Sequence, residues 1–109
     1  MTLLKEKSCI AYNKGEPPLA MAQATRLLQH LHEWSMDQKD QYIHKTFKFK
    51  NYYETMAFVN AVAWIANRED HHPDMEVGYN RCVVRYSTHS VGGLSENDFI
   101  CAAKIDALL

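Results

Sequence analysis

Residues 43–67 read IHKTFKFKNYYETMAFVNAVAWIAN, and the spacing of the apolar side chains changes halfway along them. At the start, Ile43, Phe47 and Phe49 alternate with polar residues, which predicts a strand with one buried face. From Asn51 onward the spacing of the apolar residues is helical, and those on one stripe are Met56, Val59, Val62, Ala63 and Ala66. Asn51 can cap this helix, which we expect over residues 51–67. A half-buried strand is therefore followed at once by an amphipathic helix.

The residues before this stretch predict a helix and a β-hairpin. From Leu19 the apolar residues recur at three- and four-residue steps, which predicts a helix over residues 19–33 with Pro17-Pro18 at its entry. Trp34 follows and should pack in the core. Lys39-Asp40 is the candidate turn of a hairpin over residues 34–50.

The residues after it predict two further strands and a last helix. Residues 75–79 and 81–89 alternate between apolar and polar side chains, and in the second segment Cys82, Val84 and Tyr86 share one face. Ser95 can cap the last helix, with Asp98 at its third position. The order α-β-β-α-β-β-α predicts an α+β fold, a four-stranded antiparallel sheet with helices packed on one face.

Length and charge narrow the class of protein. The 109 residues fit one domain over residues 1–109, with an N-terminal arm over residues 1–16. Twelve Lys and Arg against thirteen Asp and Glu give a net charge of -1, which argues against direct binding of nucleic acid through its phosphates. No apolar run approaches the roughly 20 residues of a membrane span, so we expect no membrane association. The first residues, MTLLKEK, lack the apolar core of a secretory signal.

The cysteine count points to a reducing compartment. Cys9, Cys82 and Cys101 are odd in number and form no CxxC motif, so neither a disulfide framework nor a zinc ribbon is indicated. We therefore expect a cytoplasmic protein. Cys82 and Cys101 lie in apolar surroundings typical of small core residues, while the role of Cys9 stays open.

Two segments stand apart from the core pattern and contain three of the six histidines. The first is Glu69-Asp70-His71-His72-Pro73, where a helix should end; the second is residues 87–95, where His89 ends a strand and a glycine pair leads into a helix. Strand ends and helix starts that meet at one edge often form a pocket. Histidine titrates near neutrality, so three in one pocket could donate and accept protons without metal or cofactor. The pattern alone leaves open whether they are catalytic or ordinary surface residues.

The other histidines and the common motifs suggest no rival site. His30 and His32 lie two apart on a predicted helix and should face solvent, as should His44. Adjacent ligands such as His71 and His72 suit a single ion poorly, and no zinc-binding spacing is present, so we expect no metal. Nucleotide-binding and hydrolase motifs are absent too, and no cofactor is expected.

In combination, the motifs resemble those of the pterin-4a-carbinolamine dehydratases, also called 4a-hydroxytetrahydrobiopterin dehydratases. The resemblance covers residues 17–109 in order, with matching elements at Trp34, Phe47-Lys48-Phe49, Phe58, Asp70-His71-His72-Pro73, Tyr79-Asn80, Ser87-Thr88-His89 and Gly93-Leu94-Ser95 with Asp98. Two positions depart from some members: Asn67 stands where a glutamate occurs, and Met75 where a tryptophan occurs. These departures leave the histidines untouched.

The resemblance implies an α+β fold and a metal-free hydro-lyase. It implies dehydration of 4a-hydroxytetrahydrobiopterin to quinonoid dihydropterin after an aromatic amino acid hydroxylase has acted. By position, the catalytic residues are then His71, His72 and His89. The implied substrate contacts are His71, His72, Pro73, Thr88, His89, Ser90 and Val91, supported by Asp70 and Asp98.

Within this set, we expect His72 and His89 to transfer protons and His71 mainly to position substrate, with acid and base unassigned. Asp70 either orients a histidine or caps the chain turn, and the cap is the simpler reading.

A second hypothesis is of another class. Relatives of this family also stabilise dimers of a transcription factor, so the chain could be a dimerisation or transcriptional co-regulator module without catalysis. The apolar surface of the 51–67 helix, including Trp64, fits self-association, although Trp64 could equally fill the core. The family resemblance also implies a homodimer or a homotetramer.

Overall fold

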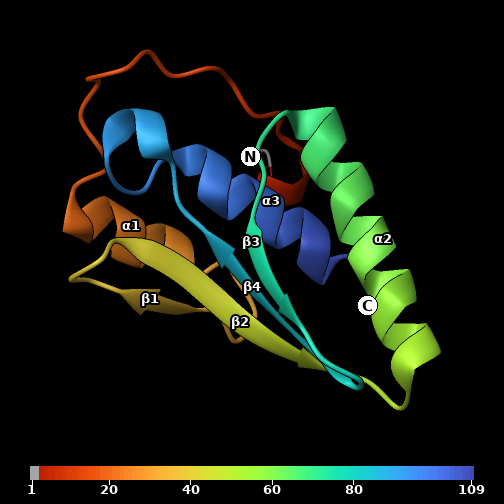
Figure 1. The fold of residues 1–109 in the computed structure, drawn as a ribbon. Helices are drawn as coiled ribbons and strands as arrows, with labels where there is room; N and C mark the ends of the chain where they lie inside the picture. The colour runs from red at the N-terminus through yellow and green to blue at the C-terminus, as the bar shows by residue number, and fades with distance from the viewer. Residues whose placement is uncertain (1–2) are drawn as a thin grey trace.

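The computed structural model describes residues 3–109, so Met1 and Thr2 of the predicted arm lie outside the described residues. The elements follow the predicted α-β-β-α-β-β-α order, with two short 3-10 helices added (Figure 1). The bounds are η1 Leu4–Glu6, α1 Met21–Leu28, β1 Ser35–Asp37, β2 Tyr42–Lys48, α2 Tyr52–Glu69, β3 Asp74–Val77, β4 Arg81–Tyr86, η2 His89–Val91 and α3 Glu96–Asp106.

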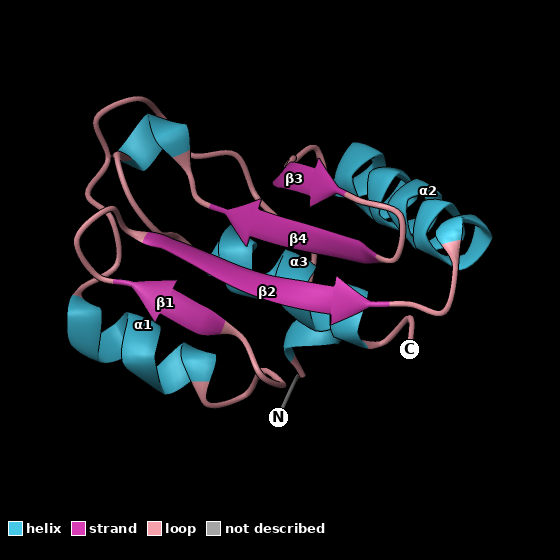
Figure 2. Ribbon diagram, turned by 60° about the horizontal axis from the view of Figure 1, so that its bottom comes forward, coloured by secondary structure: helices cyan, strands magenta, loops and turns pink. Residues whose placement is uncertain are grey.

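The four strands form one antiparallel sheet in the order β1-β2-β4-β3 (Figure 2). The register pairs Ile43 with Tyr86 and Phe47 with Cys82, all four of them buried. Alternate positions such as Thr46 and Lys48 are exposed. The predicted two-residue period is therefore confirmed, because one face of the sheet supplies the core.

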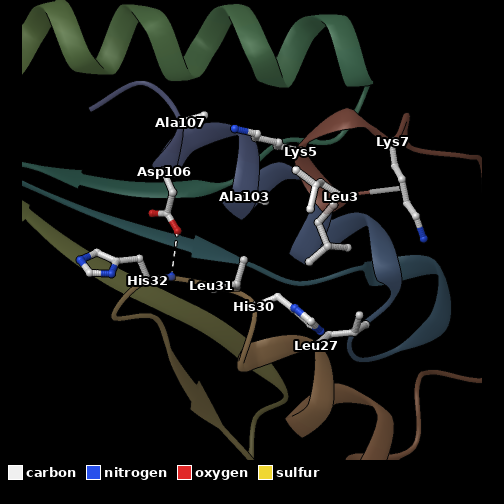
Figure 3. Close-up of a pocket in the computed structure, with 11 residues that line it drawn as sticks. Leu3, Lys5, Lys7, Leu27, His30, Leu31, His32, Ala103, Asp106 and Ala107 are labelled. Atoms are coloured by element: carbon white, nitrogen blue, oxygen red, sulfur yellow. Dashed lines mark hydrogen bonds between the residues drawn. The ribbon is translucent and has the colours of Figure 1, made fainter. Parts of the chain in front are cut away.

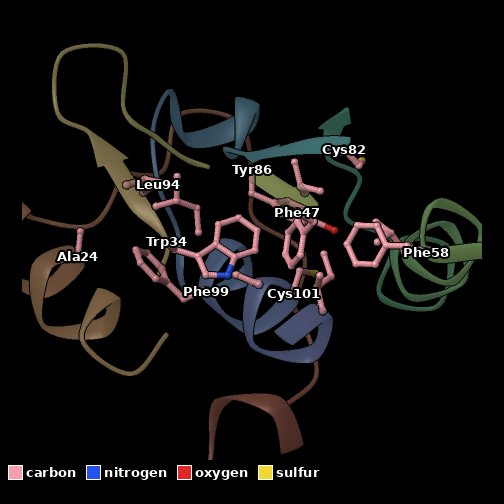
Figure 4. Packing of buried hydrophobic residues seen from close by; sticks show 14 residues of the cluster. Ala24, Trp34, Phe47, Phe58, Cys82, Tyr86, Leu94, Phe99 and Cys101 are labelled. Carbon is pink, nitrogen blue, oxygen red and sulfur yellow. The ribbon is translucent and has the colours of Figure 1, made fainter. Parts of the chain in front are cut away.

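The core lies between this face and the helices, with α3 running behind the two central strands (Figure 2). Aromatic side chains fill much of it: Phe47 packs edge-to-face on Trp34 and close to Phe58 of α2 (Figure 4). The predicted core positions of Trp34, Cys82 and Cys101 are confirmed. Because the sheet and all three α-helices contribute side chains to this core, α2 and α3 are held in place relative to β4. The candidate site lies where these three elements meet.

The first helix is shorter than predicted. It covers Met21–Leu28, not residues 19–33, and the prolines precede it instead of forming its first turn. After Leu28 the chain makes 3-10-type turns, and Glu33 adopts a positive φ of 61°. The helical spacing continues to Leu31, but the chain must turn there so that Trp34 can enter the core.

In the second helix the predicted cap is confirmed, but only part of the stripe predicted to be buried is buried. The Asn51 side chain accepts a hydrogen bond of 2.9 Å from the Glu54 amide. The buried residues are Thr55, Phe58, Val62 and Ala66. Ala63 is exposed and Trp64 is 65% exposed, so the reading that Trp64 fills the core is wrong.

The N-terminal arm, residues 3–16, runs across α3 as a strap. It is held by Lys7 to Glu96, by a pair of hydrogen bonds between Ile10 and Asn97, and by the Gly15 amide to the Ser90 carbonyl. Within residues 3–109, no helix is both long and apolar enough to cross a bilayer.

Candidate active site

The first histidine segment is positioned by the way α2 ends. Asp70 takes the left-handed conformation (φ 51°, ψ 42°), and its amide closes the last turn of the helix. The His71 amide then donates to the Ala66 carbonyl at 3.1 Å. Asp70 therefore acts on the chain through its backbone, as a helix-ending residue, and directs His71 back toward the core.

The second segment follows β4. The predicted strand over residues 81–89 is too long, because β4 ends at Tyr86 and His89 begins the 3-10 turn η2. Thr88 and Gly93 pair across this turn, through an amide-to-carbonyl bond of 2.7 Å. A Cβ on Gly93 would meet the end of the Gln41 side chain and, at 3.0 Å, Cβ of Pro18, so a larger residue here would require the flexible Gln41 side chain to move aside.

One buried carboxylate joins the two segments. Asp98 is fully buried, and its Oδ1 lies 2.6 Å from Nε2 of His71. Its Oδ2 accepts from the Thr88 hydroxyl at 2.9 Å and from the Ser95 amide at 3.0 Å. The bond from the Ser95 amide is half of the capping box predicted for α3. The same side chain thus starts a helix and holds the two histidine-bearing segments together.

The charge of Asp98 controls the protonation of His71. Burial by itself lowers the pKa of His71, but the hydrogen bond to Asp98 and the carboxylate charge together outweigh it, so the pKa lies above the ordinary value. The pair is therefore a carboxylate with an imidazole that holds its proton more firmly than a free histidine does.

Tyr86 is a residue of this site that the sequence pattern placed only in the core. Its ring stacks on His71 with centroids 5.2 Å apart, and its hydroxyl donates to the His71 carbonyl at 3.3 Å. Burial raises the pKa of Tyr86 far above its usual range, so it stays a neutral donor. The sequence did contain a hint of this role. A tyrosine at a buried strand position needs a hydrogen-bond partner for its hydroxyl, so the place of Tyr86 in the strand indicates a contact with a polar group.

The predicted site residues differ in exposure. His72 and His89 are exposed, whereas Thr88 and Val91 are buried and His71, Pro73 and Ser90 are half-buried. The network of Asp98 brings His71 and Thr88 together, and His72 and His89 each follow one of these two residues in sequence. Of the remaining histidines, His30 and His32 are exposed as predicted, but His44 is half-buried beside Tyr42, with ring centroids 5.5 Å apart.

One cavity of the described residues lies away from these histidines. It measures about 680 Å³ and opens between the arm, the end of α1 and the last turn of α3 (Figure 3). His30 and His32 line it, and none of His71, His72 and His89 does. Across residues 3–109, no group of three or more His, Cys, Asp or Glu side chains is placed to hold a metal ion.

Comparison with known proteins identifies the family of this chain. The family model described as pterin 4 alpha carbinolamine dehydratase matches residues 17–108. A protein of Nitrosomonas eutropha with the name "Putative pterin-4-alpha-carbinolamine dehydratase" is 58% identical over 107 residues, covering 97% of this chain and 93% of that protein. A protein of Nitrosospira multiformis with the same name is 59% identical over 105 residues, covering 96% and 91%.

Solved structures extend the comparison. A transcriptional coactivator/pterin dehydratase from Brucella melitensis superposes with a TM-score of 0.80 at 32% identity, over 84% of this chain and 97% of that chain. A pterin dehydratase-like protein described as a RuBisCO assembly factor in the alpha-carboxysome gives a TM-score of 0.62 at 27% identity, over 71% and 89%. With a family model that spans most of its length and relatives above 50% identity, this chain belongs to the pterin-4-alpha-carbinolamine dehydratase family of hydro-lyases.

Proposed function

We propose that this chain dehydrates 4a-hydroxytetrahydrobiopterin, or a 4a-hydroxytetrahydropterin with another side chain, to the quinonoid dihydropterin and water by histidine acid–base catalysis. The observation that carries the proposal is the Asp98 network, in which one buried carboxylate fixes both His71 and Thr88. His72 and His89 flank these two anchored residues and are themselves exposed, so they are free to meet a substrate.

The reaction needs two proton transfers and no redox change. The C4a–O bond breaks, and the oxygen leaves as water once an acid has protonated it. The N5–H proton passes to a base, and the electrons of that bond form the new C=N bond. Positioned acid–base groups of this kind contribute about 10²–10⁴-fold. His72 and His89 are our candidates for these roles, while His71, paired with Asp98, is the positioning residue.

The proposed substrate contacts are the turn His71-His72-Pro73 and the residues Thr88, His89, Ser90 and Val91. Because the Thr88 hydroxyl is bonded to both Asp98 and Ser95, Thr88 contributes through its backbone and its anchoring of the turn. The half-buried Ser90 receives the arm through its carbonyl, which keeps the η2 turn in place.

In the cell, the substrate of such a dehydratase is the product of an aromatic amino acid hydroxylase, and we propose that the chain serves tetrahydropterin recycling beside such an enzyme. We place it in the cytoplasm. The three free thiols support this assignment, because a reducing compartment keeps cysteines unpaired.

The test is a stopped-flow assay of carbinolamine loss with His72→Ala, His89→Ala and the double variant. We expect each single variant to lose at least about tenfold, and the double variant to fall by about 10²–10⁴-fold toward the uncatalysed rate. The matched control is His30→Ala with His32→Ala, exposed histidines outside the site, which should leave the rate unchanged. A folded His72/His89 double variant with the wild-type rate would disprove the proposal.

A second candidate function has its own observation. Tyr53 is 82% exposed and Trp64 65% exposed on the outer side of α2, and a groove of about 350 Å³ runs beside Tyr53 to Leu108 and Leu109. We propose that this face binds a second copy of the chain, giving a homodimer or homotetramer. A co-regulator role would use the same face, and the Brucella melitensis structure is described as a coactivator as well as a dehydratase.

Sedimentation velocity tests whether the chain self-associates, and the dehydration assay on the same protein tests whether it is also a catalyst. The wild type should sediment as an oligomer and Trp64→Ala as a smaller species, with turnover per chain retained. A monomeric wild type at micromolar concentration would count against self-association. A chain that assembles but shows no turnover would favour the non-catalytic role.

A further inference from the structure

The arm brings together two thiols that lie far apart in sequence. Sγ of Cys9 lies 3.6 Å from Sγ of Cys101, although 92 positions separate the two residues. Cys9 is half-buried in the arm, and Cys101 is fully buried in the middle of α3. The proposed dehydration uses neither thiol.

The contact is held from both sides. The Cys9 amide donates to Oε1 of Glu69 at 2.8 Å, which ties the arm to the end of α2. The next residue, Ile10, exchanges two hydrogen bonds with the Asn97 side chain, at 3.0 and 2.6 Å. Since neighbouring backbone is bonded to two different helices, Cys9 has little freedom to leave Cys101.

From this geometry we propose that Cys9 and Cys101 are a modification site, at which a small disulfide such as oxidised glutathione converts the two thiols into a reversible intramolecular disulfide. The sulfurs must approach by about 1.5 Å to reach a disulfide length of about 2.05 Å. Because hydrogen bonds hold the backbone on both sides of Cys9, rotation of its half-buried side chain supplies this movement.

The chemistry balances in two exchange steps. The hydrogen bond to Cys101, burial and the charge of Glu69 raise the pKa of Cys9, but Cys9 is the thiol of the pair that a small disulfide can reach. Cys9 therefore attacks the small disulfide, forms a mixed disulfide and releases one small thiol. Cys101 then attacks Sγ of Cys9 and expels the second small thiol, so that one disulfide is reduced as one forms. The hydrogen bond from the Cys9 thiol lowers the pKa of Cys101, burial opposes this effect, and the nearby positive charge of His71 adds to it. In the mixed disulfide Cys9 no longer carries that proton, so the charge of His71 and the 3.6 Å separation from Sγ of Cys9 are what suit Cys101 to the second attack.

The third cysteine provides the contrast. Cys82 is as buried as Cys101, but its sulfur lies 4.0 Å from the carbonyl oxygen of Val83 instead of facing another thiol. Burial raises the pKa of Cys82. Cys82 should therefore stay reduced where the other two react.

The experiment treats the full chain with oxidised glutathione, quenches it by acid and maps the thiols by mass spectrometry without reduction. We expect the mass of the single unreduced chain to fall by two hydrogens. The peptide map should show a cross-linked pair containing Cys9 and Cys101, with Cys82 free. Dithiothreitol should restore three thiols. After trypsin cuts at Lys14, the arm should stay attached to the oxidised chain and leave the reduced one.

The variants make the outcome decisive. Cys82→Ala should form the cross-link at the wild-type rate, while Cys9→Ala and Cys101→Ala should form none. Because Cys82 and Cys101 are equally buried, Cys82→Ala also controls for truncation in the core. Oxidation should raise the wild-type melting temperature by at least about 5 °C, because the cross-link closes a long loop.

Three results would overturn the proposal. They are a chain that keeps three free thiols, one that stops at a glutathione adduct on Cys9, and one that forms only intermolecular disulfides. None of these readouts depends on turnover, so the result stands apart from the proposed dehydration.

Discussion

The two ends of α3 each hold an aspartate against partners from distant parts of the chain, yet they do so with different chemistry. At the start, Asp98 faces His71, Thr88 and the Ser95 amide. At the end, Asp106 faces Lys45 of β2, the indole N–H of Trp34 and the His32 amide. A helix favours a carboxylate at its N-terminus and disfavours one at its C-terminus, so Asp106 needs a cation more than Asp98 does.

The two aspartates differ in the cation with which each is paired: Lys45 for Asp106 and His71 for Asp98. A lysine paired with a carboxylate keeps both charges across the neutral range, whereas a histidine there can exchange its proton. The Lys45 ammonium nitrogen also lies 4.7 Å from the centroid of the Phe47 ring, so it contacts the edge of the aromatic core as well as the carboxylate of Asp106. The pair of Asp106 and Lys45 therefore links α3 to the sheet at every pH near neutrality. The pair of Asp98 and His71 links α3 to the end of α2 through an imidazole that can gain or lose a proton.

The largest effect on stability should come from removing the carboxylate at the first end. Asp98→Ala leaves His71, the Thr88 hydroxyl and the Ser95 amide without their acceptor in a fully buried place. We expect a loss of about 3–5 kcal/mol in the free energy of unfolding by urea, the cost of breaking a buried pair. The milder Asp98→Asn, which keeps an acceptor oxygen, should cost less. A loss under about 1 kcal/mol for Asp98→Ala would remove the distinction between the two ends.

Asp106→Ala should cost less, about 1–3 kcal/mol, because part of its side chain reaches water and its former donors can be solvated. Urea denaturation measures this value, and Trp34 fluorescence should shift as the indole loses its acceptor. The dehydration rate of the folded variant should stay within about twofold of wild type. If the rate fell as far as it does for the histidine variants, the second end could not be called purely structural.

The dependence of stability on pH separates the two cations. Because the folded pKa of His71 is raised, its stabilising pairing is complete below the unfolded value of about 6.5 and is lost as pH rises through the folded value. The stability difference between wild type and His71→Gln should therefore be larger at about pH 5.5 than at about pH 8.5. Lys45→Met serves as the control, with a difference that is the same at both pH values. Equal pH dependence in the two variants would contradict this prediction.

The smallest effect should come from the surface pair that ties the arm beside Asp98. Lys7 and Glu96 lie 3.2 Å apart, with both side chains more than a third exposed. Glu96→Gln should change the free energy of unfolding by at most about 0.5 kcal/mol, and added salt should abolish the difference. A change above about 1 kcal/mol would show that the arm contributes more to this end of α3 than its exposed charges indicate.

The fold was largely predictable because its signals are local. Alternation marked β2 and β4, and Asn51 and Ser95 marked two helix starts. The errors occur where a long-range contact overrides a local pattern. Helical spacing continues past Leu28, but the entry of Trp34 into the core ends α1. The alternation past Tyr86 likewise yields to the pairing of Thr88 with Gly93.

The candidate site was predictable in part. The histidine segments and Asp98 were found by motif and by resemblance, while Tyr86 was placed only in the core. The exposure of Trp64 could not be read from periodicity, because apolar residues surround α2 on more than one side and only packing selects the buried stripe.

By itself, the sequence determined the α+β order, the helix caps and the two segments that carry His71, His72 and His89, since periodicity and capping depend on residues a few positions apart. Only the tertiary structure decided that Asp98 bonds His71 across 27 positions, that Asp106 is matched by Lys45, and that Cys9 meets Cys101. These contacts depend on how α3 packs between the arm, α2 and the sheet. No local pattern encodes the partner of a buried charge or thiol, because that partner is chosen by the packing of whole elements.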